Sequence, residues 1–172
     1  MALTKVNSGG INFETGAVLQ VVQTSKTDVF SETIGSGATT GVIMSVALTP
    51  SSTSSKVMLF GSISSSTGTD GQSMFIKVLR GSTQIALGDA NSSNQRSTSG
   101  GLFSGDGGRG ISTNPIQFLD SPSSTSAVTY NIKMGTTEGT NIVVYVNRGK
   151  TTGSGSEFGR IISTLTAMEI AG

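Results

Sequence analysis

Apolar residues in this chain alternate with polar ones over short stretches, and they nowhere recur at the spacing of an amphipathic helix. The clearest stretch is 128–134, in which Val, Tyr, Ile and Met alternate with Thr, Asn and Lys. Successive side chains of a strand point to opposite faces, so this pattern predicts a half-buried strand. Because Gly, Ser and Thr interrupt every window long enough to form a helix, the chain is predicted to be all-β.

The same pattern predicts a series of short strands separated by turn signals. These strands are expected over residues 18–23, 28–34, 42–49, 57–63, 73–80, 83–88, 98–103, 115–120, 127–134, 141–147 and 158–170. Gly81-Ser82 separates two of them by two residues with Gly first, which predicts a type II′ hairpin. A series of this kind is typical of an antiparallel β-sandwich or jelly roll, and 172 residues favour a single domain. We assign that domain to residues 17–172.

One phrase occurs twice, as Pro50-Ser-Ser-Thr-Ser and again as Pro122-Ser-Ser-Thr-Ser. Each copy follows one predicted strand and precedes another. Proline lacks an N–H and suits the exit of a strand, and the hydroxyl side chains can hold a turn through local hydrogen bonds. Both phrases are therefore predicted to be corners of the sandwich.

The composition excludes several kinds of chemistry. The chain has no His and no Cys, which removes Ser-His-Asp and Cys-His catalysis together with the usual zinc ligands. Its Asp and Glu residues are isolated in the sequence, and each is expected to be solvated or to form a turn. Asp70-Gly71 and Asp106-Gly107 are not predicted to bind calcium, because neither is followed by the spaced Asp and Asn residues of a calcium-binding loop. Residues 105–110 are rich in glycine but lack the Lys of a phosphate-binding loop. We predict a non-enzymatic protein with no catalytic, cofactor-binding or metal-binding residues.

Charge is sparse and evenly spread. The net charge is +1, with no basic run, which argues against binding to nucleic acid or insertion into a membrane. Charged residues make up 12% of the chain, against about 25% in an ordinary soluble domain. The strands at 57–63 and 158–170 are apolar on both faces, so we expect them to be covered on both sides. Interface cores are depleted in charge, and the sequence therefore predicts a homo-oligomer.

Two further segments are candidates for contact with partners. Residues 1–16 are polar and include Gly9-Gly10, so they are predicted to be an arm outside the core, and they contain no apolar stretch typical of a secretory signal.

A candidate recognition loop spans the polar, glycine-rich region 89–111, because loops on a rigid scaffold often carry recognition. Its candidate residues are Asn91, Asn94, Arg96, Asp106 and Arg109.

Five stretches carry a resemblance to a known family, in the order TPSSTSSKVML, LRGSTQIALGDA, IQFLDSPSSTSAVTYNIKM, VYVNRGKT and IISTLTAMEIAG. The most specific pieces are the hairpin at Leu79–Ser82, the corner at Phe118–Pro122 and the closing Met168–Ile170. From Val18 to Gly172 the chain resembles the small jelly-roll modules in fibre, knob and decoration proteins of tailed bacteriophages, particularly those of marine and cyanobacterial hosts.

This resemblance implies a structural protein on the virion surface, commonly a homotrimer with a sandwich similar to that of tumour necrosis factor. The start MALTKV is similar to that of phage fibre proteins, in which the leading arm attaches to other virion proteins. An arm of about sixteen residues leaves no room for a shaft, which favours a compact knob or a capsid decoration. Distal loops would then face a host glycan or receptor. The family supplies no catalytic residues.

Two other functions stay open. A carbohydrate-binding module would present aromatic platforms, but the chain has no Trp, and its two tyrosines, Tyr130 and Tyr145, both lie in predicted strands. A polysaccharide depolymerase would need a pair of carboxylates, and the isolated Asp and Glu residues disfavour it.

Overall fold

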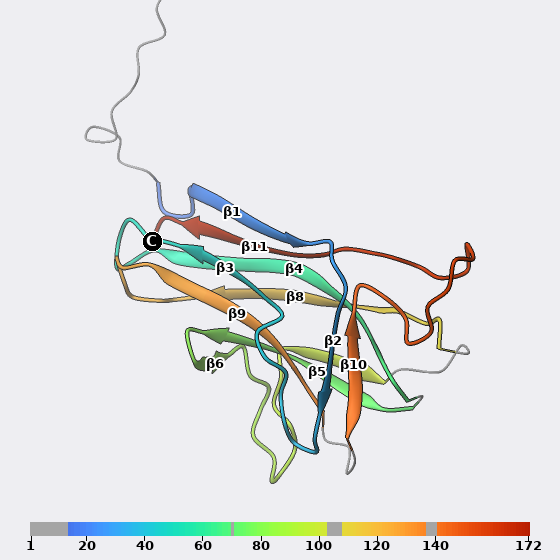
Figure 1. Ribbon diagram of the computed structural model, residues 1–172. Coiled ribbons are helices and arrows are strands. Elements are labelled where there is room, and N and C mark those ends of the chain that lie inside the picture. Colours follow the sequence, from blue (N-terminus) through green and yellow to red (C-terminus); the bar gives the residue numbers. More distant parts are fainter. Residues whose placement is uncertain (1–13, 70, 103–107, 137–140) are drawn as a thin grey trace, which may run out of the picture.

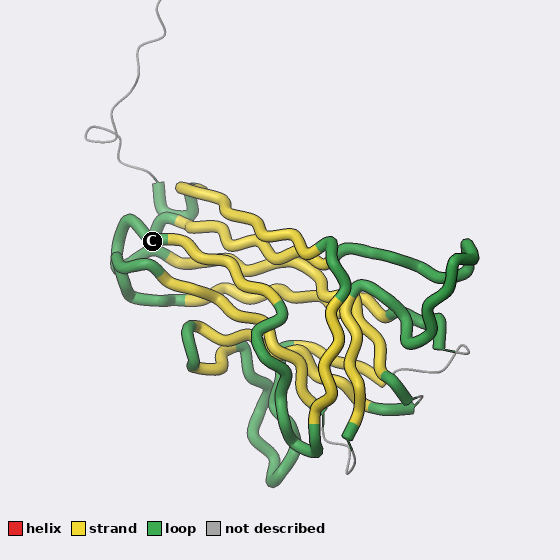
Figure 2. The backbone as a smooth tube through the Cα atoms, in the orientation of Figure 1, coloured by secondary structure: helices red, strands yellow, loops and turns green. Residues whose placement is uncertain are grey.

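The computed structural model describes residues 14–69, 71–102, 108–136 and 141–172. Strands make up its body, loops connect them at both ends and along the lower side of the view, and no helix occurs among the described residues (Figure 2). The strands are β1 (Val18–Lys26), β2 (Phe30–Ile34), β3 (Met44–Leu48), β4 (Lys56–Thr67), β5 (Ser73–Arg80), β6 (Thr83–Ile85), β7 (Ser99–Leu102), β8 (Ser112–Asp120), β9 (Val128–Gly135), β10 (Ile142–Val146) and β11 (Ser163–Ile170).

These strands form two sheets (Figure 1). The six-stranded sheet has the order β1-β11-β4-β10-β2, and β8 pairs with the other edge of β4. The five-stranded sheet has the order β3-β9-β5-β6, with β7 also paired to β5. Every pairing between named strands is antiparallel, so the predicted antiparallel β-sandwich is confirmed.

The predicted local features are confirmed with small changes of length. β5 and β6 form the predicted hairpin, and Gly81 has a φ of +59° while Ser82 has no positive φ, as a type II′ turn requires. The last strand begins at Ser163 rather than at residue 158. It pairs with β1 on one edge and with β4 on the other.

The core lies between the two sheets and follows the alternation in the sequence. In β4, Val57, Leu59 and Ile63 are fully buried, and the side chains between them point away from the core. In β9 every second residue is buried, and Tyr130 among them is fully enclosed.

Both Pro-Ser-Ser-Thr phrases form the corners that the sequence predicts. The first joins β3 in the five-stranded sheet to β4 in the six-stranded sheet, and the second leads from β8 back to β9. Gly16 N–H donates to the Ala171 carbonyl, and the Ser54 hydroxyl donates to the Gly172 carbonyl. The first corner, the start of β1 and the C-terminus therefore lie together at one end of the sandwich.

Candidate assembly face and recognition loop

The outer face of the six-stranded sheet carries a row of apolar side chains. The register places Leu119 of β8, Met58 of β4, Met168 of β11 and Val21 of β1 opposite one another. Each of them points away from the core, because its neighbours along the strand are the core-facing residues. We call this outer surface over β8, β4, β11 and β1 the assembly face.

The assembly face is open in the single chain. Leu119 and Val21 are 53% and 55% exposed, and Phe60, one row along, is 39% exposed. Within one protomer, the expectation that the strands at 57–63 and 158–170 are covered on both sides is therefore wrong, since Ile162 is also 54% exposed. The second face of β4 reaches solvent because no element of the described chain packs over that part of it.

No charged residue lies on the middle of the assembly face. Three successive outward rows, counted from the pairings, contain no Asp, Glu, Lys or Arg. Their members are Leu119, Met58, Met168 and Val21, then Gln117, Phe60, Thr166 and Gln23, then Pro115, Ser62, Thr164 and Ser25. The first row is wholly apolar, and the next two rows mix Phe60 and Pro115 with uncharged polar residues. An exposed apolar patch with no charge around it is typical of an interaction site.

The outer face of the other sheet differs. There Lys77 of β5 lies directly opposite Lys133 of β9, and exposed Thr129 and Ala47 lie on the same face. Partial burial lowers the pKa of the Lys77 ammonium. This pair of lysines interrupts the outer face of the five-stranded sheet, whereas the six-stranded sheet has three successive rows without charge.

The first corner is held by a buried carboxylate. Glu169 is 1% exposed and accepts hydrogen bonds from the Ser51 N–H at 2.6 Å, the Ser51 hydroxyl at 2.7 Å and the Ser55 hydroxyl at 2.8 Å, all on one oxygen. Its other oxygen accepts from Gln20 Nε2 at 2.6 Å. Burial by itself raises the pKa of the Glu169 carboxyl, but the hydrogen bonds from Gln20, Ser51 and Ser55 outweigh burial and lower that pKa below its ordinary value.

The second corner is held in a similar way. Asp120 is 6% exposed and accepts from Arg80 Nη1 at 3.0 Å on both oxygens, and from the Tyr130 hydroxyl at 2.8 Å. Arg80 also donates to the carbonyl of Ser121 in the corner itself. Burial and the neighbouring Asp120 carboxylate raise the pKa of the Tyr130 hydroxyl, so Tyr130 stays a hydrogen-bond donor.

These two carboxylates correct the expectation that every Asp and Glu is solvated or forms a turn by itself. Asp120 and Glu169 both lie opposite Val57, on the inner face of the sheet, and each is saturated by groups of the fold. Among the described residues, no group of three or more Asp and Glu side chains is arranged to hold a metal ion. Neither carboxylate had a direct signal in the sequence beyond its position next to a strand end.

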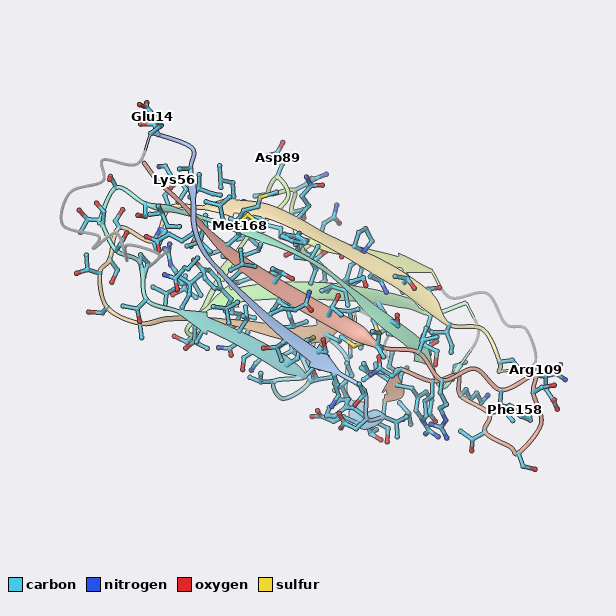
Figure 3. The ribbon with its side chains drawn as sticks, turned by 90° about the horizontal axis from the view of Figure 1, so that it is seen from above. Glu14, Lys56, Asp89, Arg109, Phe158 and Met168 are labelled. Atoms are coloured by element: carbon cyan, nitrogen blue, oxygen red, sulfur yellow. The ribbon has the colours of Figure 1, made fainter. Side chains whose placement is uncertain are left out.

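The candidate recognition residues lie in two different places. Asn91, Asn94 and Arg96 lie on the loop between β6 and β7, where all three are exposed. Arg109 lies in the next loop along the chain, beside Gly108, whose carbonyl accepts from the Thr151 N–H. Figure 3 shows Asp89 of the first loop well apart from Arg109, so the predicted single display site is divided. Asp106 lies outside the described residues.

The loop between β6 and β7 is braced against the sheet. Arg96 Nε donates to the Gly88 carbonyl at 2.6 Å, and Gln84 Nε2 donates to the Arg96 carbonyl at 2.8 Å. Two hollows flank this loop. One is lined by Leu87, Phe118 and neighbours, and the other by Phe75, Ser93, Asn94 and Gln95.

Neither tyrosine is an open aromatic platform. Tyr130 is fully buried, and Tyr145 is half-buried with the Arg148 guanidinium 4.3 Å from the centre of its ring. An exposed stacking surface therefore has to come from a phenylalanine, which the sequence reasoning did not consider.

Comparison with known proteins finds similarity in structure only. No family model matches the sequence, and no curated protein matches it. A chain in the structure of infectious bursal disease virus, Gt strain, aligns with a TM-score of 0.51 at 12% identity, covering 100% of this chain and 43% of that one. The protein shares its fold with a chain of a virus. The VP2 subviral particle of the same virus aligns with a TM-score of 0.47 at 9% identity, covering 99% and 46% of the two chains.

The chain thus spans less than half the length of these solved proteins. At this level of identity the likeness concerns the sandwich fold and no individual residue. Among the described residues, no helix combines the length and apolar character that crossing a membrane requires.

Proposed function

We propose that this protein is a non-enzymatic structural component of a virion surface, and that its copies associate through the assembly face. The observation that carries this proposal is the uncharged apolar surface around Met58, Phe60 and Leu119, which a protein working as a separate monomer has little reason to expose. The fold shared with a chain of infectious bursal disease virus supports a place in a virus particle. The resemblance to bacteriophage knob and decoration modules supports the same role.

We further propose a homotrimer, in which each protomer turns its assembly face toward its neighbours. Closed symmetric assemblies bury such a face on every copy, whereas an open array leaves one face exposed at each end. The bacteriophage modules that the sequence resembles are commonly trimers, and this is the reason for preferring three copies.

The two ends of the sandwich suit two different contacts. Glu14, near the end of the proposed arm, lies at one end of the molecule, while Arg109 lies at the opposite end (Figure 3). The arm, residues 1–16, would dock on other virion proteins at the first end. The loops at a distance from that end would face the medium and the host.

The mass of the protein in solution tests the assembly face. Wild-type protein at micromolar concentration should have the mass of several chains in light scattering, and Leu119→Lys should be a monomer, because the new charge lies in the apolar row. Ala47→Lys, on the exposed outer face of the other sheet, is the matched control and should leave the mass unchanged. A monomeric wild type, or Leu119→Lys with the wild-type mass, would refute the proposal.

A truncation tests the docking role of the arm. Deleting residues 1–13 keeps the hydrogen bond between Gly16 and Ala171, so the sandwich should fold and assemble as before. The truncated chain should be absent from purified particles. Its incorporation at the wild-type level would show that the arm does not dock.

A further inference from the structure

A hollow beside Phe75 is lined by this aromatic ring and by Ser93, Asn94 and Gln95. Phe75 lies on the outer face of β5, between the buried Met74 and Ile76, and its own side chain is half-exposed. Its neighbours across the sheet are Gly100 of β7 on one side and Gly135 of β9 on the other. The ring therefore has no neighbouring side chain directly across from it on either strand.

Gly100 lets the Phe75 ring lie against the sheet. A Cβ atom at this position would come within 3.0 Å of Phe75 Cδ1 and 2.6 Å of the Met74 carbonyl oxygen. Any larger residue would have to displace the ring or the neighbouring strand. On the other side, the end of the Lys77 side chain passes over Gly135, 3.1 Å from where a Cβ atom would be.

Polar groups of the loop between β6 and β7 form the rest of the hollow. Ser93 and Asn94 are exposed, and Gln95 is half-buried with its Oε1 held by Lys77 Nζ at 2.9 Å. This bond fixes the plane of the Gln95 amide before any ligand arrives, and it engages the Lys77 ammonium. Ser92, next to these residues, has a φ of +48°, so the loop holds a backbone conformation that is costly for a residue other than glycine.

We propose that this hollow binds one neutral pyranose ring of a surface polysaccharide. A flat aromatic ring next to hydroxyl and amide groups offers an apolar surface for the C–H face of a sugar, and it offers donors and acceptors for the sugar hydroxyls. The residues that line the hollow, Phe75, Ser93, Asn94 and Gln95, carry no charge, and the nearby Lys77 ammonium is already engaged by Gln95, so we assign the site to a neutral sugar.

The position of the hollow agrees with the assembly that we propose. It lies on the outer face of the five-stranded sheet, whereas the assembly face belongs to the six-stranded sheet. Copies joined through the assembly face would leave every hollow open to the medium. This inference rests on the proposed function, because a sugar site would serve contact with a host or environmental glycan only if the protein lies on a virion surface.

Titration of the protein with simple sugars tests the site. The probes are the methyl glycosides of glucose, galactose and mannose, and methyl sialoside is the charged comparison. Binding is monitored by the side-chain amide signals of Asn94 and Gln95 in ¹⁵N–¹H spectra. At least one neutral glycoside should bind saturably, at about millimolar strength, and should shift those two amide signals. Asn94→Ala and Phe75→Leu should each weaken binding by about tenfold.

Two substitutions are matched controls, because they change the same residue types and leave the hollow intact. Asn91→Ala changes the same loop outside the hollow, and Phe158→Leu changes a half-buried phenylalanine of another loop. Both should bind as the wild type does. Absence of saturable binding, binding of methyl sialoside alone, or binding unchanged in Asn94→Ala and Phe75→Leu would each overturn the inference.

The same samples separate this inference from the proposed function. If the protein binds the glycoside at this site but has the mass of one chain, the glycan site is supported and the proposed assembly through the six-stranded sheet is refuted. If it assembles through the outer face of the six-stranded sheet but binds no sugar, the assembly stands and the glycan site is refuted.

Discussion

Replacing Glu169 by Gln should destabilise the protein strongly, although the two side chains have nearly the same shape. The Glu169 carboxylate accepts four hydrogen bonds in a buried place, three on Oε1 and one on Oε2. A glutamine can keep its oxygen at the Oε1 position. Its NH₂ group then meets Gln20 Nε2, so that two donors face each other where one charge-assisted hydrogen bond existed.

The magnitude follows from that arrangement. Losing one hydrogen bond to a charged acceptor costs about 1.5–3 kcal/mol, and the three remaining bonds weaken because the acceptor is now neutral. We expect a loss of about 2–4 kcal/mol in the free energy of unfolding. For a chain of this length the midpoint of thermal unfolding should fall by roughly 5–15 °C.

Thermal and urea unfolding at neutral pH measure this loss, and Glu157→Gln is the control. Glu157 is exposed, so its substitution should change the free energy of unfolding by less than about 0.5 kcal/mol. A Glu169→Gln protein as stable as the wild type would show that the carboxylate does not hold the first corner.

The dependence of stability on pH tests the same reasoning. The pKa of Glu169 is lower in the folded protein than its ordinary value of 4.5, so the ionised carboxylate stabilises the fold. That contribution is fully present above the ordinary pKa of 4.5 and is lost as the pH falls through the folded pKa. Acid should therefore destabilise the wild type more than Glu169→Gln. Equal losses in the two proteins would contradict the lowered pKa.

Three further substitutions test the fold by unfolding measurements. Asp120→Asn removes the charge that Arg80 and Tyr130 share at the second corner and should cost about 1–3 kcal/mol; an unchanged stability would refute its role. Gly61→Ala places a Cβ atom against the Thr164 carbonyl of β11 and should cost about 3 kcal/mol or more; a Gly61→Ala protein of wild-type stability would contradict the close approach of the strands. Gly81→Ala should cost about 1 kcal/mol because of its positive φ, whereas Gly88→Ala, equally unobstructed but without a positive φ, should not.

The sandwich could be predicted because its signals are local. Alternation at period two, a glycine at the first turn position of the hairpin and two proline phrases depend only on neighbours in sequence, and the structure confirms each of them. The same kind of signal also identified the apolar outer side of β4, at Met58 and Phe60. It could not show whether another part of the chain covers that side.

The candidate sites were predicted less well, because they depend on contacts between distant segments. Glu169 meets Ser51 across 118 positions of sequence, and Asp120 meets Arg80 across 40. In the sequence, Phe75 is an ordinary apolar residue of a strand. The fold places Gly100, Gly135 and the loop at Asn94 around it, and these neighbours leave its ring half-exposed beside polar groups. The predicted recognition residues were neighbours in sequence, yet the fold separates the loop of Arg109 from the loop that carries the first three.

Consecutive residues were enough to predict an antiparallel sandwich with two corners and few charges, in which some strands carry apolar side chains on both faces. Strand periodicity and turn chemistry are properties of consecutive residues, so they can be read before the chain folds. The folded chain was needed to show which face stays uncovered, which carboxylates are buried and where a half-exposed aromatic ring lies beside polar groups. These properties depend on which strands pair and in what register, and pairing joins residues that the sequence leaves far apart.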